Sequence, residues 1–147
     1  MFFWFFEARS GAAAAPLTVW LQGGPGAAST DQAVSGHNGP CAVLPGSRST
    51  RSNPHSWNAR SNMLYVDQPA QTGFTHDEVV PGVLDMLTGE VDVGPGGGGV
   101  PLNWTAVRGR FSSQLVNRTA HSTNLAARAV VEFLGLWMEE WAAPFSP

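Results

Sequence analysis

The sequence predicts an α/β fold with a mostly parallel sheet, and three stretches carry that prediction. Residues 17–21 and 62–67 are apolar runs of strand length, and a turn rich in Gly, Pro or Gln follows each. Near-continuous apolar strands are typical of a parallel sheet that is covered on both faces. Residues 122–143 repeat apolar side chains every three or four positions, as a helix with one buried face does.

The composition fits one modest folded domain. The chain has 147 residues, of which 43% are hydrophobic and 13% are charged, against ~25% charged in an average protein. A net charge of −3 without Lys/Arg clusters argues against nucleic acid as a partner. No apolar run reaches the ~18 residues of a membrane span. Cys41 is the single cysteine, which excludes an internal disulfide.

The first half of the chain is expected to supply the strands. Residues 2–6 are an aromatic strand that could pair with 17–21 as a hairpin, although no Asn-Gly or Asp-Gly turn supports this pairing. Residues 27–60 are expected to be loop with a short helix near 30–34. The segment before residue 7 has no basic residue and meets Glu7 early, so no signal peptide is predicted.

The second half is expected to hold two helices and a loop. Residues 77–87 are expected to form a short helix. The glycines at 94–99 lie in a flexible loop at about 88–101, which lacks the Gly-Lys-Ser/Thr ending of a nucleotide-binding loop. In the long helix, Ser122 or Thr123 can cap the start and Pro144 stops the end. Its buried face is expected to hold five residues: Ala126, Val130, Phe133, Trp137 and Trp141.

The turn after residues 17–21 carries the strongest chemical signal. Glycines 23, 24 and 26 have no Cβ, so their backbone N–H groups can remain open to an incoming atom. Such a loop can hold a phosphate or the oxyanion of an acyl-transfer intermediate. A purely structural turn is the alternative interpretation of this stretch alone.

Four motifs at their spacing resemble the N-terminal part of a serine carboxypeptidase, closely over about residues 2–75. The motifs are Leu17–Gly26, His37–Cys41 with Ser56–Asn58, Asn62–Pro69, and Thr72–Thr75. The resemblance implies an α/β-hydrolase fold over 1–147. Asp67 is expected to accept backbone N–H bonds in a structural role. Ala70-Gln71 stands where the family tends to have Val-Gly.

The resemblance also implies the roles of individual residues. The backbone N–H of Gly24 would be one oxyanion-hole donor. Trp20, Gln22, Gly23 and His37 match the family's group that recognises a peptide's terminal carboxylate. Gln22 stands in place of the commoner Asn, and His37 stands in place of Glu, one residue further along than usual. An imidazolium could pair with a carboxylate, and histidines are mostly charged below about pH 6.5.

No nucleophile elbow occurs in the sequence, because no Gly is followed two residues later by Ser. His55, His76 and His121 lie upstream of where a nucleophile would be, and they are expected to be surface residues. The expectation is therefore a serine-type carboxypeptidase truncated before its nucleophile, without its later strands, and inactive alone. The alternatives are a truncated carboxypeptidase-like acyltransferase or esterase, and a non-catalytic carboxylate-binding paralogue.

The remaining expectations concern partners and location. The implied partner is a peptide with a free C-terminal carboxylate, and no cofactor or metal is implied. By resemblance, the protein would be secreted or vacuolar. Asn103 and Asn117 begin glycosylation sequons, a weak indication of the secretory route. The sequence leaves the oligomeric state and the preferred C-terminal side chain open.

Overall fold

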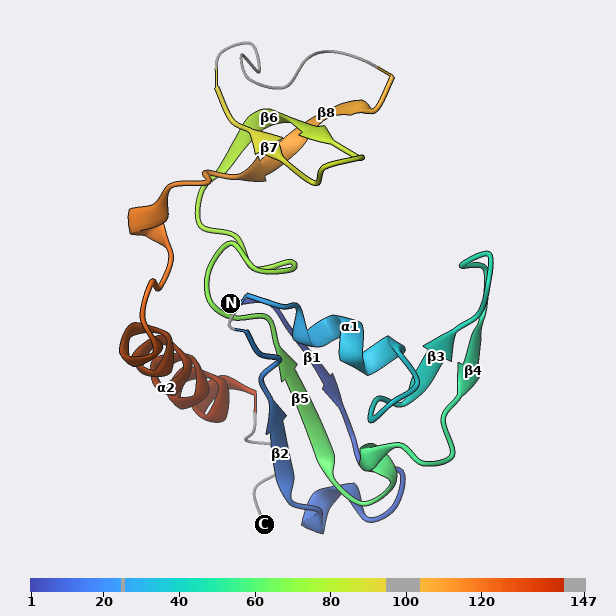
Figure 1. Ribbon diagram of the computed structural model, residues 1–147. Coiled ribbons are helices and arrows are strands. Elements are labelled where there is room, and N and C mark those ends of the chain that lie inside the picture. Colours follow the sequence, from blue (N-terminus) through green and yellow to red (C-terminus); the bar gives the residue numbers. More distant parts are fainter. Residues whose placement is uncertain (25, 95–103, 142–147) are drawn as a thin grey trace.

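The computed structural model describes residues 1–24, 26–94 and 104–141, which form a mixed α/β structure with one long helix (Figure 1). The strands are β1 (Phe3–Phe6), β2 (Leu17–Trp20), β3 (Cys41–Val43), β4 (Thr50–Ser52), β5 (Asn62–Val66), β6 (Val79–Asp85), β7 (Val91–Asp92) and β8 (Ala106–Ser112). The α-helices are α1 (Ser29–Val34) and α2 (Thr123–Glu140), and the short 3₁₀ helices are η1 (Ala12–Ala14), η2 (Trp57–Ala59) and η3 (Val116–Arg118).

The main sheet has the strand order β1-β5-β2, so β5 lies in the centre (Figure 1). β2 runs parallel to β5, whereas β1 runs antiparallel to it. The expected hairpin of the first two strands is therefore wrong, because β5 inserts between them. Among the described strands, this sheet is mixed rather than mostly parallel, since one of its two pairings is antiparallel.

β5 is buried along its whole length because a helix covers each face of the sheet. Met63 and Tyr65 point to one face, where they pack with Ala33 of α1. Leu64 and Val66 point to the other, where they pack with Trp137 of α2. The alternation of side chains along a strand thus explains why β5 is apolar at nearly every position.

The long helix is confirmed, with small differences at its end. The Ser122 hydroxyl accepts a hydrogen bond from the Leu125 backbone N–H at 3.3 Å, which caps the start as expected. The described helix ends at Glu140, and the predicted stop at Pro144 lies outside the described residues. Trp141 is 57% exposed rather than buried, although its ring packs edge-on against Phe3 at 5.7 Å.

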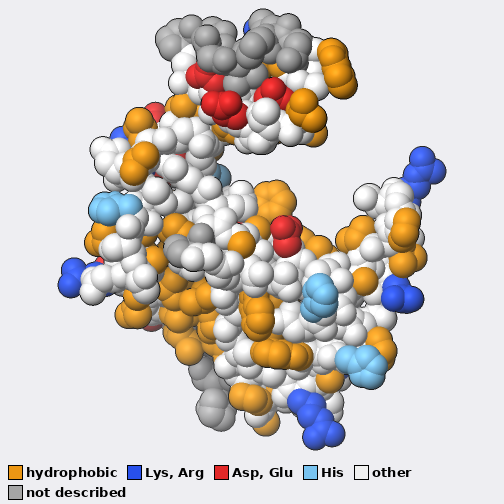
Figure 2. Space-filling view, viewed as in Figure 1, with side chains coloured by type: hydrophobic (Ala, Val, Ile, Leu, Met, Phe, Trp, Pro, Cys, Tyr) orange, Lys and Arg blue, Asp and Glu red, His pale blue; other side chains and the backbone are white. Residues whose placement is uncertain are grey.

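Residues 79–85 form a strand, so the helix expected over 77–87 is wrong. β6 is the centre of a second sheet, with the order β7-β6-β8. Pro81 and Gly82 in the middle of this segment disfavour a helix. Figure 2 shows this sheet standing apart from the main body across a hollow. The glycine run expected in a loop lies mostly outside the described residues.

Candidate functional site

The candidate site lies at the carboxyl edge of the parallel pair β2 and β5. Parallel strands end at the same edge of a sheet, so the loops that follow β2 and β5 are neighbours (Figure 1). In open α/β sheets, this is the edge where ligands bind. The two loops consist of residues 21–28 and 67–75.

The loop after β5 is held by the buried carboxylate of Asp67. Its Oδ1 accepts the backbone N–H of Thr30 at 3.0 Å, and its Oδ2 accepts the Thr30 hydroxyl at 3.1 Å. The Phe74 backbone N–H also donates to Oδ2, at 3.0 Å. The Thr75 hydroxyl closes the turn by donating to the Asp67 carbonyl at 2.6 Å. Asp67 therefore has the structural role that the sequence predicted, because it joins the first turn of α1 to residues 67–75.

Ser29 joins the two loops to each other. Its buried hydroxyl accepts the backbone N–H of Gln22 at 2.9 Å and donates to the carbonyl of Val66 at 2.6 Å. The start of the glycine loop is thereby fixed to the last residue of β5. Sequence reasoning missed this residue, since a serine at a helix start is ordinarily assigned to capping alone.

The glycine loop itself is open. Gly23 and Gly24 are exposed, and a Cβ added at either would meet no atom within 4 Å. Within the described residues, no acceptor pairs with the backbone N–H of Gly23 or Gly24. Gly26 has a φ of +102°, which only glycine adopts readily. The backbone N–H groups of Gly23 and Gly24 therefore remain available to an anion.

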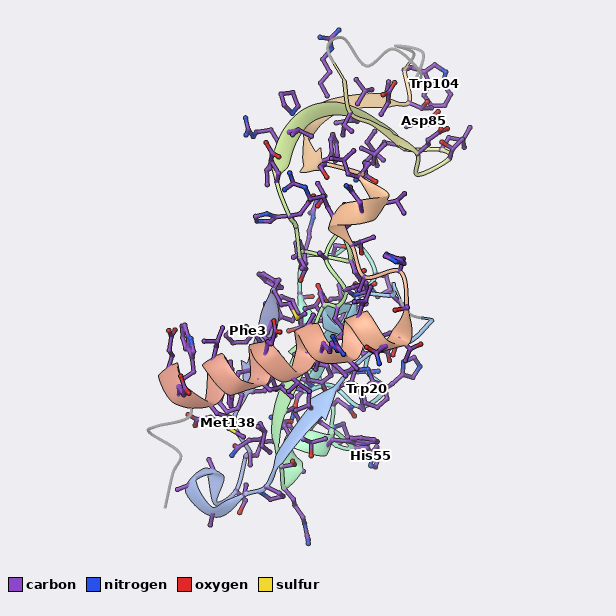
Figure 3. The ribbon with its side chains drawn as sticks, turned by 90° about the vertical axis from the view of Figure 1, so that its left-hand side faces the viewer. Phe3, Trp20, His55, Asp85, Trp104 and Met138 are labelled. Carbon is purple, nitrogen blue, oxygen red and sulfur yellow. The ribbon has the colours of Figure 1, made fainter. Side chains whose placement is uncertain are left out.

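Trp20 fixes the orientation of the Gln22 side chain. The indole Nε1–H of Trp20 donates to Oε1 of Gln22 at 3.1 Å. The ring of Trp20 is itself held edge-on against Trp57, with ring centroids 5.4 Å apart. In Figure 3, Trp20 is labelled on the main sheet, and the labels of Trp20 and Phe3 lie on opposite sides of α2. Trp57 is a support that sequence reasoning did not assign.

His37 lies past the C-terminal end of α1, whereas Gln22 is bonded to the N-terminal end of that helix. Its ring Nδ1 is 2.9 Å from the Ser35 hydroxyl, and its carbonyl accepts the Asn53 amide at 3.0 Å. The imidazole is exposed. Among the described residues, no hydrogen bond joins His37 to Trp20, Gln22 or Gly23. A direct role of His37 in the site remains a prediction.

The other residues singled out by the sequence lie away from this edge. His55, His76 and His121 are exposed, as expected. Asn117 is exposed in η3, and Asn103 lies outside the described residues. The described part of the chain holds no group of three or more His, Cys, Asp or Glu that could bind a metal. None of its helices is long and apolar enough to cross a membrane.

Comparisons with known proteins agree with these motifs. The profile of the family described as serine carboxypeptidase matches residues 1–88. Carboxypeptidase S1 homolog A of Arthroderma otae is 44% identical over 141 residues, which is 95% of this chain and 22% of the relative. Carboxypeptidase Y of Schizosaccharomyces pombe is 38% identical over 93 residues, 63% of this chain and 9% of that protein.

A solved structure is also similar to the chain. The crystal structure of Kex1(Δ)p, a prohormone-processing carboxypeptidase from Saccharomyces cerevisiae, matches with a TM-score of 0.43 and 38% identity. It covers 50% of this chain and 15% of that one. The chain spans about a fifth of the length of the S1 homologues that it matches. On its sequence, the chain belongs to the serine carboxypeptidase family.

Proposed function

We propose that residues 1–147 are part of an α/β-hydrolase domain that supplies the carboxylate-recognition and oxyanion loop of a serine-type carboxypeptidase. Such an enzyme releases C-terminal residues from peptides, and its partner here is a peptide with a free C-terminal carboxylate. The observation that carries this proposal is the hydrogen bond from the Trp20 indole to Gln22 Oε1. A secreted or vacuolar location is proposed with it, on the strength of the family.

The bond matters because an indole N–H can only donate. It binds the oxygen of the Gln22 amide, so the Nε2 group with its two N–H donors is directed away from Trp20. A carboxylate accepts hydrogen bonds and donates none. The two N–H donors of the Gln22 amide, with the open N–H groups of Gly23 and Gly24 beside it, make a set of donors for such a ligand.

The Gly24 N–H is proposed as one oxyanion-hole donor. A donor of this kind is worth about 3 to 4 kcal/mol of transition-state stabilisation when a nucleophile attacks. The 147 residues contain no Gly-x-Ser-x-Gly elbow, so a nucleophile would have to come from outside them. Carboxylate binding is therefore the part of the function that this chain can reveal by itself.

The test is calorimetric binding of a blocked dipeptide with a free C-terminal carboxylate, and of the same dipeptide with a C-terminal amide. Binding of the acid alone is expected. Gln22→Glu keeps the shape, replaces the donors by acceptors and adds a negative charge, and it should weaken binding by at least about tenfold, or 1.4 kcal/mol. Gln32→Glu adds the same charge on α1 and should leave binding unchanged. Equal binding of acid and amide would refute the proposal.

His37 is proposed as a further, pH-dependent contact to the same carboxylate. Since a protonated imidazole is positively charged and can pair with a carboxylate, acid binding should strengthen on acidification. His37→Ala should remove this strengthening, whereas His55→Ala, at another exposed histidine, should not. An unchanged pH profile in His37→Ala would leave Gln22 and the glycine loop as the recognition group.

A further inference from the structure

The direction of the Trp20 indole N–H depends on the rotation of the ring about its bond to Cβ. This torsion is broad and roughly two-fold in tryptophan, so an unrestrained ring could turn its N–H away from Gln22. The ring packs against the core cluster of Ala33, Met63 and Tyr65, but it is only partly buried there. A ring that is only partly buried needs a further contact to hold one rotation.

Trp57 supplies that further contact. The ring centroids of Trp20 and Trp57 are 5.4 Å apart, and the two planes meet at 85°. This edge-to-face arrangement is one that aromatic pairs favour. Rotation of the Trp20 indole would either displace the ring of Trp57 or break the contact between them. The Trp57 side chain is itself 51% exposed, so its place must be set by its backbone.

The backbone of η2 holds Trp57 in place from three segments that are distant in the sequence. The Trp57 N–H donates to the carbonyl of Asn38 in the loop after α1, at 2.9 Å. The next residue, Asn58, is bonded to the segment after β1. Its side-chain amide donates to the Glu7 carbonyl at 3.1 Å, and its own carbonyl accepts the Arg9 N–H at 2.7 Å. These bonds fix the point from which the Trp57 ring projects toward Trp20.

We infer that Trp57 is a positioning residue for carboxylate recognition, which acts through the ring of Trp20 on the amide of Gln22. The inference rests on the proposed function and adds to it a residue outside the glycine loop. The contacts run from the Asn38 carbonyl through the rings of Trp57 and Trp20 to Oε1 of Gln22. Because Asn38 follows His37, this segment is joined to Gln22 by contacts that do not involve the imidazole.

A positioning role and a merely structural role predict different results when Trp57 is truncated. Because half of the side chain is exposed, Trp57→Ala is expected to fold, which circular dichroism establishes. A merely structural role would change the stability alone. A positioning role also changes the protection of the Trp20 indole N–H in the ligand-free chain, and it changes the affinity for a carboxylate.

Hydrogen exchange of the Trp20 indole N–H, followed by NMR, tests the contact without a ligand. The signal is identified by its loss in Trp20→Phe. Trp57→Ala should speed the exchange at least about threefold, and Trp57→Phe, which keeps an aromatic ring, should restore slow exchange. Trp104→Ala is the control, because Trp104 is 94% exposed and lies beside the second sheet, away from Trp20 (Figure 3). An unchanged rate in Trp57→Ala would overturn the inference.

Calorimetry with the blocked dipeptide acid then tests whether Trp57 acts through Trp20. Trp57→Ala and Trp20→Phe should each raise the Kd at least about threefold, and the double variant should be no weaker than Trp20→Phe alone. Additive losses would mean that Trp57 acts independently of Trp20, which contradicts the inference. A wild type that binds neither the acid nor the amide would overturn the proposed function and the ligand part of this inference. The exchange measurement decides separately whether Trp57 orients Trp20.

Discussion

The loops after β2 and β5 lie at the same edge of the main sheet, but they use their glycines in opposite ways. In the β5 loop, Gly73 has a φ of +55°, and an added Cβ would lie 2.2 Å from Oδ2 of Asp67. In the β2 loop, the corresponding space around Gly24 is empty. One glycine is required by close packing around a buried carboxylate, and the other leaves backbone donors exposed.

This difference separates a supporting loop from the loop for which we propose a role in binding. The β5 loop is bonded to α1 through Asp67 and Thr30, and to the segment after β8, where the Gln71 amide donates to the Leu115 carbonyl at 2.9 Å. The β2 loop is fixed at its start by Ser29 and is open at Gly23 and Gly24. A rigid support beside an open set of donors is the arrangement that pre-organised anion recognition requires.

The largest expected effect comes from Gly73→Ala. The new Cβ would displace the Asp67 carboxylate and would require a left-handed alanine, so we expect a loss of about 3 kcal/mol or more in the free energy of unfolding. Gly24→Ala is the matched variant in the other loop, and its stability should stay within about 0.5 kcal/mol of wild type. Urea denaturation measures both. Equal losses would remove the distinction between the loops.

A smaller effect is expected for Ser29→Ala, which cuts the link between the loops. The Gln22 N–H and the Val66 carbonyl would lose their buried partner, at a cost of about 1–3 kcal/mol in the free energy of unfolding. Ser35→Ala removes an exposed hydroxyl from the other end of α1 and should cost no more than about 0.5 kcal/mol. Similar losses in the two variants would mean that the hydrogen bonds of Ser29 stabilise the fold no more than an exposed hydroxyl does.

The smallest effect concerns the hydrogen bonds between the residue that follows β8 and the segment that leads into β6. The Ser113 hydroxyl and backbone N–H donate to Asp77, and chiefly the hydroxyl bond lowers the pKa of Asp77 from 3.8 to about 2. A lowered pKa means that the ionised carboxylate stabilises the folded state. This contribution is complete above about pH 4, and it is lost as the pH falls through about 2.

Asp77→Asn should therefore speed hydrogen exchange of the β6 and β8 amides at pH 6, after correction for the intrinsic rate. The variant and the wild type should converge near pH 2. Asp31→Asn, at an exposed aspartate of α1, should leave β6 and β8 unaffected at either pH. A difference that persists undiminished at pH 2 would show that the ionisation of Asp77 is not its cause.

Local patterns predicted the parts of the fold that depend on local interactions. The spacing of apolar residues predicted α2. The continuous apolar run predicted that β5 would be covered on both faces, and a helix covers each. The pairings were not predictable in the same way, because β5 joins β1 across more than fifty residues and no turn signal marks this contact. β6 was mistaken for a helix because its partner β8 lies 21 residues beyond it in the chain, from Asp85 to Ala106.

The site shows the same division. The structural role of Asp67 followed from its motif, but the bridge by Ser29 and the support from Trp57 depend on contacts that only the folded chain makes. Gln71 stands where the family tends to have Gly, and its φ of +73° explains that preference. A left-handed conformation costs an L-residue roughly 1–2 kcal/mol, and the bond from Gln71 to Leu115 offsets part of this cost.

If the proposed function holds, the indole of Trp20 has a consequence for which chain ends the site would distinguish. An unrestrained glutamine amide can rotate by half a turn and offer either its oxygen or its nitrogen, so it would accept an amidated chain end as readily as an acidic one. The indole of Trp20 can only donate, so its bond to Gln22 Oε1 favours one orientation of the amide. Discrimination between a free and an amidated C-terminus would then depend on Trp20, a side chain that need not contact the ligand.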